Sequence, residues 1–166
     1  MDSFLLQWAG MTRESALLLI PLVAFAEACV GIGLFVSGFI VLILATTFYS
    51  LQLVSLAEIS LLAFLGAAAG DHTGYWCGRL LGPRLHHALR RPRTAALAER
   101  ADALIRRHGG AAVVIGRFFP AVRSIVPALV GLSGYPPFKY SLLDIVTCMV
   151  WGPALAALVA LGAQAF

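Results

Sequence analysis

The chain has 166 residues, of which 60% are hydrophobic and 12% are charged, and its formal net charge is +4. Soluble domains carry about 25% charged residues, so this composition, with a mean hydropathy of +0.89, excludes an ordinary soluble protein and indicates one integral membrane domain over residues 1–166. No nucleic-acid-binding motif accompanies the basic residues, which argues against a nucleic-acid partner.

The first half of the chain opens with a short amphipathic segment, residues 1–14, that lacks the basic start of a secretory signal. From Ser15 to Ala57 the only charged residue is Glu27. This run is long enough for about two crossings at ~20 residues each, but no polar loop divides it. The run can form three structures: one long helix, two helices with a buried turn, or a helix followed by a re-entrant hairpin. Glycine and serine breaks in mid-run, Gly38 among them, favour the last.

A long helix is predicted next, from Ser50 to Arg79, with Glu58 near its start. Four glycines recur at four-residue intervals and lie on one stripe of this helix: Gly66, Gly70, Gly74 and Gly78. Small residues in such a stripe let a neighbouring backbone approach closely, and we favour packing over a ligand groove there. Asp71 lies towards the end of the helix, where we expect it to order the following loop together with Arg79.

Residues 80–108 form a basic loop after Gly82 and Pro83 end the helix. Eight of the twelve Lys and Arg residues lie between Arg79 and Arg107. Leucines among these arginines predict an amphipathic helix that rests on anionic headgroups. A short basic loop is cytoplasmic by the positive-inside rule, so we expect two membrane halves, residues 15–79 and 109–166, on either side of it.

The stretch from Ala111 to Tyr135 is apolar but contains Arg117, Arg123, Pro120 and Pro127. A charged side chain at mid-bilayer costs at least about 3 kcal/mol. On an unbroken helix six residues turn by roughly 600°, so the two arginines would lie about 120° apart. Pro120 removes a helix hydrogen bond between them, and a break there would let both guanidinium groups point at one place. We predict a re-entrant, broken helix that presents two arginines to an anionic ligand.

The last crossing is predicted from Phe138 to Phe166, and we expect four residues to interrupt it: Asp144, Trp151, Gly152 and Pro153. The order of features in the second half repeats that of the first, with a broken apolar segment that contains buried charge and then a crossing with an early acid. Broken segments in corresponding positions of two halves indicate a transporter site. In an inverted repeat, Glu27 and the arginines would meet near the midplane.

Three stretches have the residue spacing of a family signature. They are FAEACVGIGLFVSG at Phe25–Gly38, GDHTGYWCGRLLG at Gly70–Gly82, and GRFFPAVRSIVPALVGLSGYPPFKY at Gly116–Tyr140. With them the chain resembles the DedA family, also called the SNARE-associated or VTT-domain family, from about residue 20 to residue 162. The third stretch is the most specific, because it contains the run Gly-Arg-Phe-x-Pro-x-x-Arg.

The resemblance implies an all-α helical bundle with two re-entrant hairpins of opposite orientation in a bacterial inner membrane. It implies movement of phosphate-bearing lipids, either undecaprenyl phosphate or phospholipids, with proton coupling in some members. By motif position, Glu27 falls on the family's essential acid, Arg117 and Arg123 on its essential arginine pair, and Asp71 on its Gly-Asp signature. The chain departs from the family at 37–39, where many members have a second acid, and this weakens the case for proton coupling through an acid pair.

The chemistry of the arginines leaves two readings open. Arginine is a planar fork that binds phosphate oxygens in pairs and stays protonated. We expect Arg117 and Arg123 to bind a lipid phosphate, and Glu27 to exchange a proton or to pair with them. In the alternative, the arginines only pair with acids such as Glu27, Glu58 or Asp144 to hold the bundle together. Otherwise we expect Glu58 and Asp144 to support helix packing, and Pro120, Pro127 and Gly38 to act as hinges.

Two function classes follow, a lipid flippase and a non-transporting structural or assembly protein whose buried ion pairs fix helix register. We expect no enzyme, because the sequence has no recognisable pair of a nucleophile and a histidine, and His72 beside Asp71 is a lone feature. We expect no cofactor and no metal site, because the three cysteines form no ligand spacing. Membrane lipids and protons are the expected partners, and a homo-oligomer stays open.

Overall fold

The computed structural model describes residues 12–34, 38–82, 103, 107–108, 111–118 and 123–164, without the side chains of residues 34, 116–118 and 164. The elements are α2 (Arg13–Ala28), the 3-10 helix η1 (Ile32–Leu34), α3 (Gly38–Ser50), α4 (Leu56–Leu81), α7 (Ala111–Phe118), α8 (Val126–Leu132) and α9 (Pro137–Gln164). No strand occurs among the described residues, which confirms the predicted all-α class for this part of the chain. Most of the predicted basic amphipathic loop lies outside the described residues.

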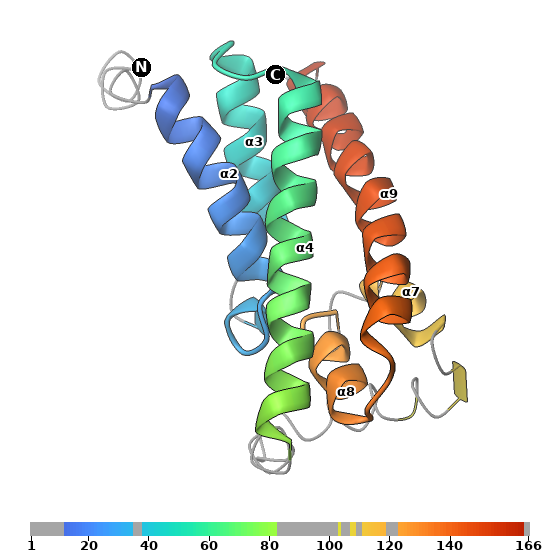
Figure 1. Ribbon diagram of the computed structural model, residues 1–166. Helices are drawn as coiled ribbons and strands as arrows, with labels where there is room; N and C mark the ends of the chain where they lie inside the picture. The colour runs from blue at the N-terminus through green and yellow to red at the C-terminus, as the bar shows by residue number, and fades with distance from the viewer. Residues whose placement is uncertain are drawn as a thin grey trace.

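Helix α4 is the central element of the bundle (Figure 1), and α2, α8 and α9 each pack against it. Helix α2 lies along one half of α4 with α3 beside it, and α8 lies along the other half (Figure 1). The turn that follows α2 therefore lies partway along α4 rather than at its end. This arrangement brings the turn after α2 close to the turn before α8.

Glycines divide the first apolar run into two helices. Helix α2 begins with a capping box between Thr12 and Ser15 and ends at Ala28, and α3 begins at Gly38. A Cβ atom on Gly33 would lie 2.0 Å from the backbone oxygen of Glu27, so only glycine lets the chain fold back there. The single long helix is thus excluded. The re-entrant hairpins and the inverted repeat remain predictions, as do the boundaries of the two halves.

Helix α4 begins later than the sequence predicts. The chain makes a turn after Ser50, with Gln52 at a φ of 56°, and the helix starts only after Ser55, whose capping box with Glu58 satisfies the first N–H groups. The predicted end is confirmed. Helix α4 ends before Gly82, whose N–H donates to the carbonyl oxygen of Gly78 at 3.1 Å.

The predicted glycine stripe on α4 is a packing surface. A Cβ atom on Gly66 would lie 2.2 Å from the backbone oxygen of Pro21 in α2, and a Cβ atom on Gly78 would lie 1.8 Å from that of Ala128 in α8. Such contacts are shorter than any side chain allows, so the glycines let α2 and α8 approach α4 along one line. Close van der Waals packing of this kind holds helices together in lipid, where apolar burial supplies little driving force.

Helix α9 is continuous from Pro137 to Gln164, so the predicted interruption of the last crossing is wrong. Pro153 lies inside the helix, and Gly152 is a close contact, because its Cβ would lie 2.6 Å from the backbone oxygen of Ser60 in α4. Among the described helices, α9 alone is long and apolar enough to cross a membrane by itself. Its outward side chains include Leu142, Met149, Leu158 and Leu161, which are more than half exposed and fit a lipid environment.

Candidate functional site

An ion pair joins the two halves of the chain inside the bundle. Glu27 lies in the last turn of α2, and Arg123 lies in the turn that precedes α8. The Nη1 atom of Arg123 donates to Oε1 of Glu27 at 2.7 Å, and the two side chains are 12% and 3% exposed. The structure thus brings Glu27 to one of the two predicted arginines.

The surroundings of the pair hold the guanidinium group in place. The Cζ atom of Arg123 lies 5.1 Å from the centre of the Trp151 ring, within the range of a cation–π contact. Gly38 covers the carboxylate of Glu27, because a Cβ there would lie 2.6 Å from Oε1. The buried Nη2 atom of Arg123 has no hydrogen-bond partner among the described residues. An unsatisfied buried donor is costly, so this edge of the guanidinium group favours a further acceptor.

A small cavity lies beside Arg123. Its volume is about 10 Å³ and it is lined by Asp71, Val113, Arg123, Val126, Pro127 and Asp144. This is close to the smallest space that holds one water molecule. A lipid phosphate therefore needs some movement of the surrounding helices before it can reach Arg123 here.

The structure does not describe the side chains of two other predicted site residues, Arg117 and Pro120. Arg117 belongs to α7 by its backbone, but its side chain lies outside the described part, and so does the whole of Pro120. The convergence of the two guanidinium groups therefore stays a prediction. Residues 123–125 form a turn and α8 starts at Val126 with Pro127 in its first turn, but the predicted break at Pro120 lies outside the described residues and stays a prediction.

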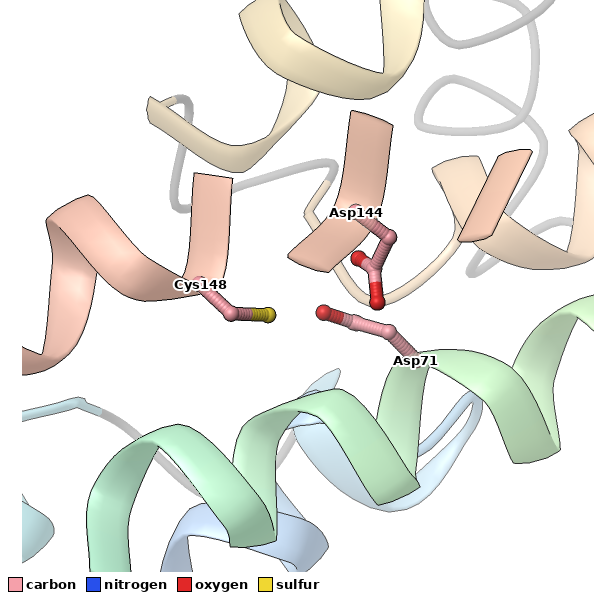
Figure 2. Close-up of side chains that lie close together, drawn as sticks. All are labelled: Asp71, Asp144 and Cys148. Carbon is pink, nitrogen blue, oxygen red and sulfur yellow. The ribbon is translucent and has the colours of Figure 1, made fainter. Parts of the chain in front are cut away.

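Asp71, Asp144 and Cys148 face one another between α4 and α9 (Figure 2). All three are buried, and their oxygen and sulfur atoms lie within 4.8 Å of one another. These atom types can coordinate a cation. However, Arg123 lines the same cavity as the two aspartates, and its positive charge would repel a bound cation. The loop that Asp71 is expected to order lies outside the described residues, so that expectation stays a prediction, but the described hydrogen bonds of Arg79 go to other groups. Arg79 instead donates to Tyr75 Oη at 3.0 Å and to the backbone oxygen of Tyr135 at 3.1 Å.

The structure also corrects the expectation that no nucleophile lies beside a histidine. The Nε2 atom of His72 lies 3.0 Å from Oγ of Ser141, and its Nδ1 atom lies 3.2 Å from Oδ2 of Asp144. Sequence reasoning missed this group because 69 residues separate His72 from Ser141. A usable signal was present, since Ser141 and Asp144 are three residues apart and so share a helix face.

The helical position of Ser141 bears on what this serine–histidine–aspartate group can do. A nucleophilic serine needs preorganised donors for the developing oxyanion. Ser141 is the fifth residue of α9, beyond the four N–H groups that a helix start leaves free. Its neighbouring backbone N–H groups are therefore occupied within the helix, and the group is better suited to holding protons than to attacking a substrate.

Glu58 is not part of the site. It forms an ion pair with Arg13 and accepts a hydrogen bond from the backbone N–H of Ser55 at 2.8 Å. Glu58 and Arg13 line a cavity of about 720 Å³ at the end of the bundle where α4 starts. Tyr49 and Ala163 also line this cavity. The acid therefore caps α4 rather than facing Arg123.

Comparisons with known proteins identify a family and several similar membrane proteins. Residues 17–161 match the family model described as the VTT domain. The chain is 24% identical to inner membrane protein YabI of Escherichia coli over 153 residues, which cover 92% of this chain and 60% of that protein. It is 33% identical to inner membrane protein YohD of the same bacterium over 128 residues, which cover 76% of this chain and 65% of that protein. Protein DedA of Escherichia coli is 23% identical over 137 residues, 78% of this chain and 61% of that protein.

The chain spans about three fifths of the length of YabI and DedA. No solved structure matches it.

Proposed function

Because the chain belongs to the VTT domain family, whose matched relatives include inner membrane proteins, we propose that it moves a phosphate-bearing lipid across a bacterial inner membrane. The lipid is undecaprenyl phosphate or a phospholipid, and its phosphate binds to Arg123 together with Arg117. The family membership supports a membrane protein. The choice of cargo rests on the chemistry of the arginines.

The single observation that carries this proposal is the buried guanidinium group of Arg123 at a break between two helices. A buried arginine is expensive in a membrane and marks a functional site by default. Broken backbone at membrane depth persists only where it is buried in protein or lines a water-filled cavity. The Nη2 edge of Arg123 has no acceptor among the described residues, and the planar guanidinium fork suits two phosphate oxygens.

In this proposal Glu27 is the ion-pair partner that holds Arg123 until a phosphate displaces it, and we call this role a latch. In the closed arrangement its carboxylate holds Arg123 at 2.7 Å, and the adjoining cavity has only about 10 Å³. A lipid phosphate that arrives at Arg123 takes over the charge compensation, and Glu27 then takes up a proton. This exchange would couple lipid movement to protons, because a buried carboxylate without a cation is unstable.

A second candidate function is a structural or assembly role without transport. The tight Glu27–Arg123 pair favours it, because such a pair can fix the relative position of α2 and α8 without any ligand. Liposomes with labelled lipid phosphates separate the two functions. We expect wild type to move the lipid and Arg123→Ala to lose this activity. A folded wild type that moves none of the lipids would support the structural role.

Arg13→Ala is the matched control for that assay. It also removes an arginine from an arginine–glutamate pair, but the Arg13 side chain is 60% exposed and lies at the start of α2. We expect this variant to transport like wild type. Equal loss in both variants would point to general destabilisation instead of a role for Arg123.

A further inference from the structure

The guanidinium group of Arg123 has two edges with different surroundings. Nη1 donates to Oε1 of Glu27 at 2.7 Å, and the centre of the Trp151 ring lies 5.1 Å from Cζ. These two contacts fix the orientation of the planar group. Nη2, on the other edge, is buried and has no acceptor among the described residues. Because a buried donor is stable only when it is hydrogen-bonded, this edge favours a ligand that can accept.

The cavity beside Arg123 limits the size of such a ligand. Its volume is about 10 Å³, close to the smallest space that holds one water molecule. Three of the residues that line it are apolar: Val113 of α7, and Val126 and Pro127 of α8. A molecule larger than water therefore fits only if these helices move.

The polar walls of the same cavity provide acceptors. Asp71 of α4 and Asp144 of α9 line it, and one carboxylate oxygen of each lies within 4.8 Å of the other (Figure 2). A water molecule that donates to two oxygens at ~2.8 Å reaches oxygens about 4.5 Å apart. Each carboxylate has about four lone-pair sites, so it can accept from this water while it also bonds to other groups. The fit therefore holds whichever other partners the two aspartates have.

We propose that one water molecule is bound in this cavity, where it accepts from Nη2 of Arg123 and donates to the carboxylates of Asp71 and Asp144. A small cation is a poorer occupant, because the guanidinium group repels it. Water is neutral, and its acceptor and two donors match these three side chains. It joins the turn before α8 to α4 and α9 and is a part of the bundle, as buried waters with several hydrogen bonds are.

This site goes beyond the proposed function, because the water is bound whether or not the protein moves a lipid. Where the proposed function holds, the two are linked at one atom. A phosphate oxygen that reaches Nη2 of Arg123 then takes the place of the water, after the helices around the cavity have moved.

Solid-state nuclear magnetic resonance of the full chain in liposomes tests the site, with the arginine side chains labelled with nitrogen-15. Magnetisation is transferred from water protons to the guanidinium nitrogens, and the signal that Arg123→Lys removes belongs to Arg123. We expect this transfer in wild type. Val126→Ile adds a methylene group to the cavity wall and should abolish the transfer. Val130→Ile should retain it and is the matched control, because Val130 is equally buried in α8 but is not among the residues that line the cavity.

Val113→Ile fills the cavity from α7 and is the second variant, with circular dichroism in detergent as the check that each protein is folded. No transfer from water to Arg123 in wild type would overturn the proposal. A transfer that both cavity-filling variants retain in full, or that the Val130→Ile control loses as well, would also overturn it.

The outcomes separate the water site from the proposed function. A wild type that shows the transfer as expected but moves no lipid would uphold the water site and contradict only lipid transport. In a transporting protein, an added lipid phosphate should weaken the transfer at Arg123. An unchanged transfer there would contradict the replacement of the water by a phosphate oxygen and leave the water site standing.

Discussion

Arg123 and Glu27 lie 96 residues apart in the chain, and their side chains meet at 2.7 Å inside the bundle. The contact joins the end of α2 to the turn before α8, so each broken segment provides one partner. Removing one partner of a buried pair typically costs about 3–5 kcal/mol, because the other charge stays buried without compensation. The pair is therefore a structural joint, and in the proposed function it is also the place where a lipid phosphate binds.

Glu27→Gln should abolish lipid transport while the protein stays folded. The glutamine side chain keeps the volume and an oxygen that accepts from Arg123 Nη1, but it cannot exchange a proton or balance the positive charge. Transport in liposomes and circular dichroism in detergent measure the two properties. Normal lipid movement in this variant would remove Glu27 from the mechanism.

Arg123→Lys should reduce transport strongly, and Arg117→Lys should do the same. Lysine keeps the charge but loses the planar fork that binds two phosphate oxygens. A bidentate contact that becomes single loses on the order of 1–3 kcal/mol, which corresponds to about 5- to 150-fold weaker lipid binding. Binding of a labelled lipid phosphate to the purified variants measures this, and full affinity would indicate simple charge balance.

Trp151→Leu should lower stability by about 1 kcal/mol, because it removes the cation–π contact with Arg123. Trp151→Phe keeps an aromatic ring and is the control, with a smaller loss expected. Chemical unfolding in detergent micelles gives the two free energies of unfolding. Equal losses for leucine and phenylalanine would mean that ring size, rather than the contact with the guanidinium group, determines the effect.

Gly78→Ala should destabilise the bundle by about 1–3 kcal/mol, because the new Cβ would overlap the backbone oxygen of Ala128 and force α4 and α8 apart. Gly162→Ala is the matched control in α9, where the nearest atom to a Cβ is 3.8 Å away in Thr46. That variant should be neutral or more stable by up to about 1 kcal/mol. The melting temperatures of the two variants in detergent show which of them is less stable. A Gly78→Ala protein as stable as wild type would contradict the close packing.

Features that depend on local chemistry could be predicted from the sequence. Only glycine allows the backbone contacts made by Gly33 and Gly78, so the break after α2 and the packing stripe of α4 are visible in the residue pattern. The meeting of Glu27 with an arginine also follows from the order of features in the two halves. A buried charge in each broken segment needs a partner of opposite sign.

Features that depend on helix rotation could not be predicted. The group formed by His72, Ser141 and Asp144 requires a specific face of α4 to meet a specific face of α9, and no local pattern sets that rotation. Pro153 misled the prediction of α9 because a proline removes one hydrogen bond but leaves the helix to continue when its neighbours pack around it. Gly152 misled it too, because that glycine serves close contact with α4.

The most direct test is the distance between a lipid phosphate and Arg123 in a membrane. Solid-state nuclear magnetic resonance measures the dipolar coupling between the phosphorus atom of an anionic lipid and the labelled guanidinium nitrogens of the protein. The account predicts a coupling in wild type that shows direct contact, is lost in Arg123→Lys and grows in Glu27→Gln, where the latch no longer competes. A wild type that moves labelled lipid but shows no coupling at Arg123 would contradict it.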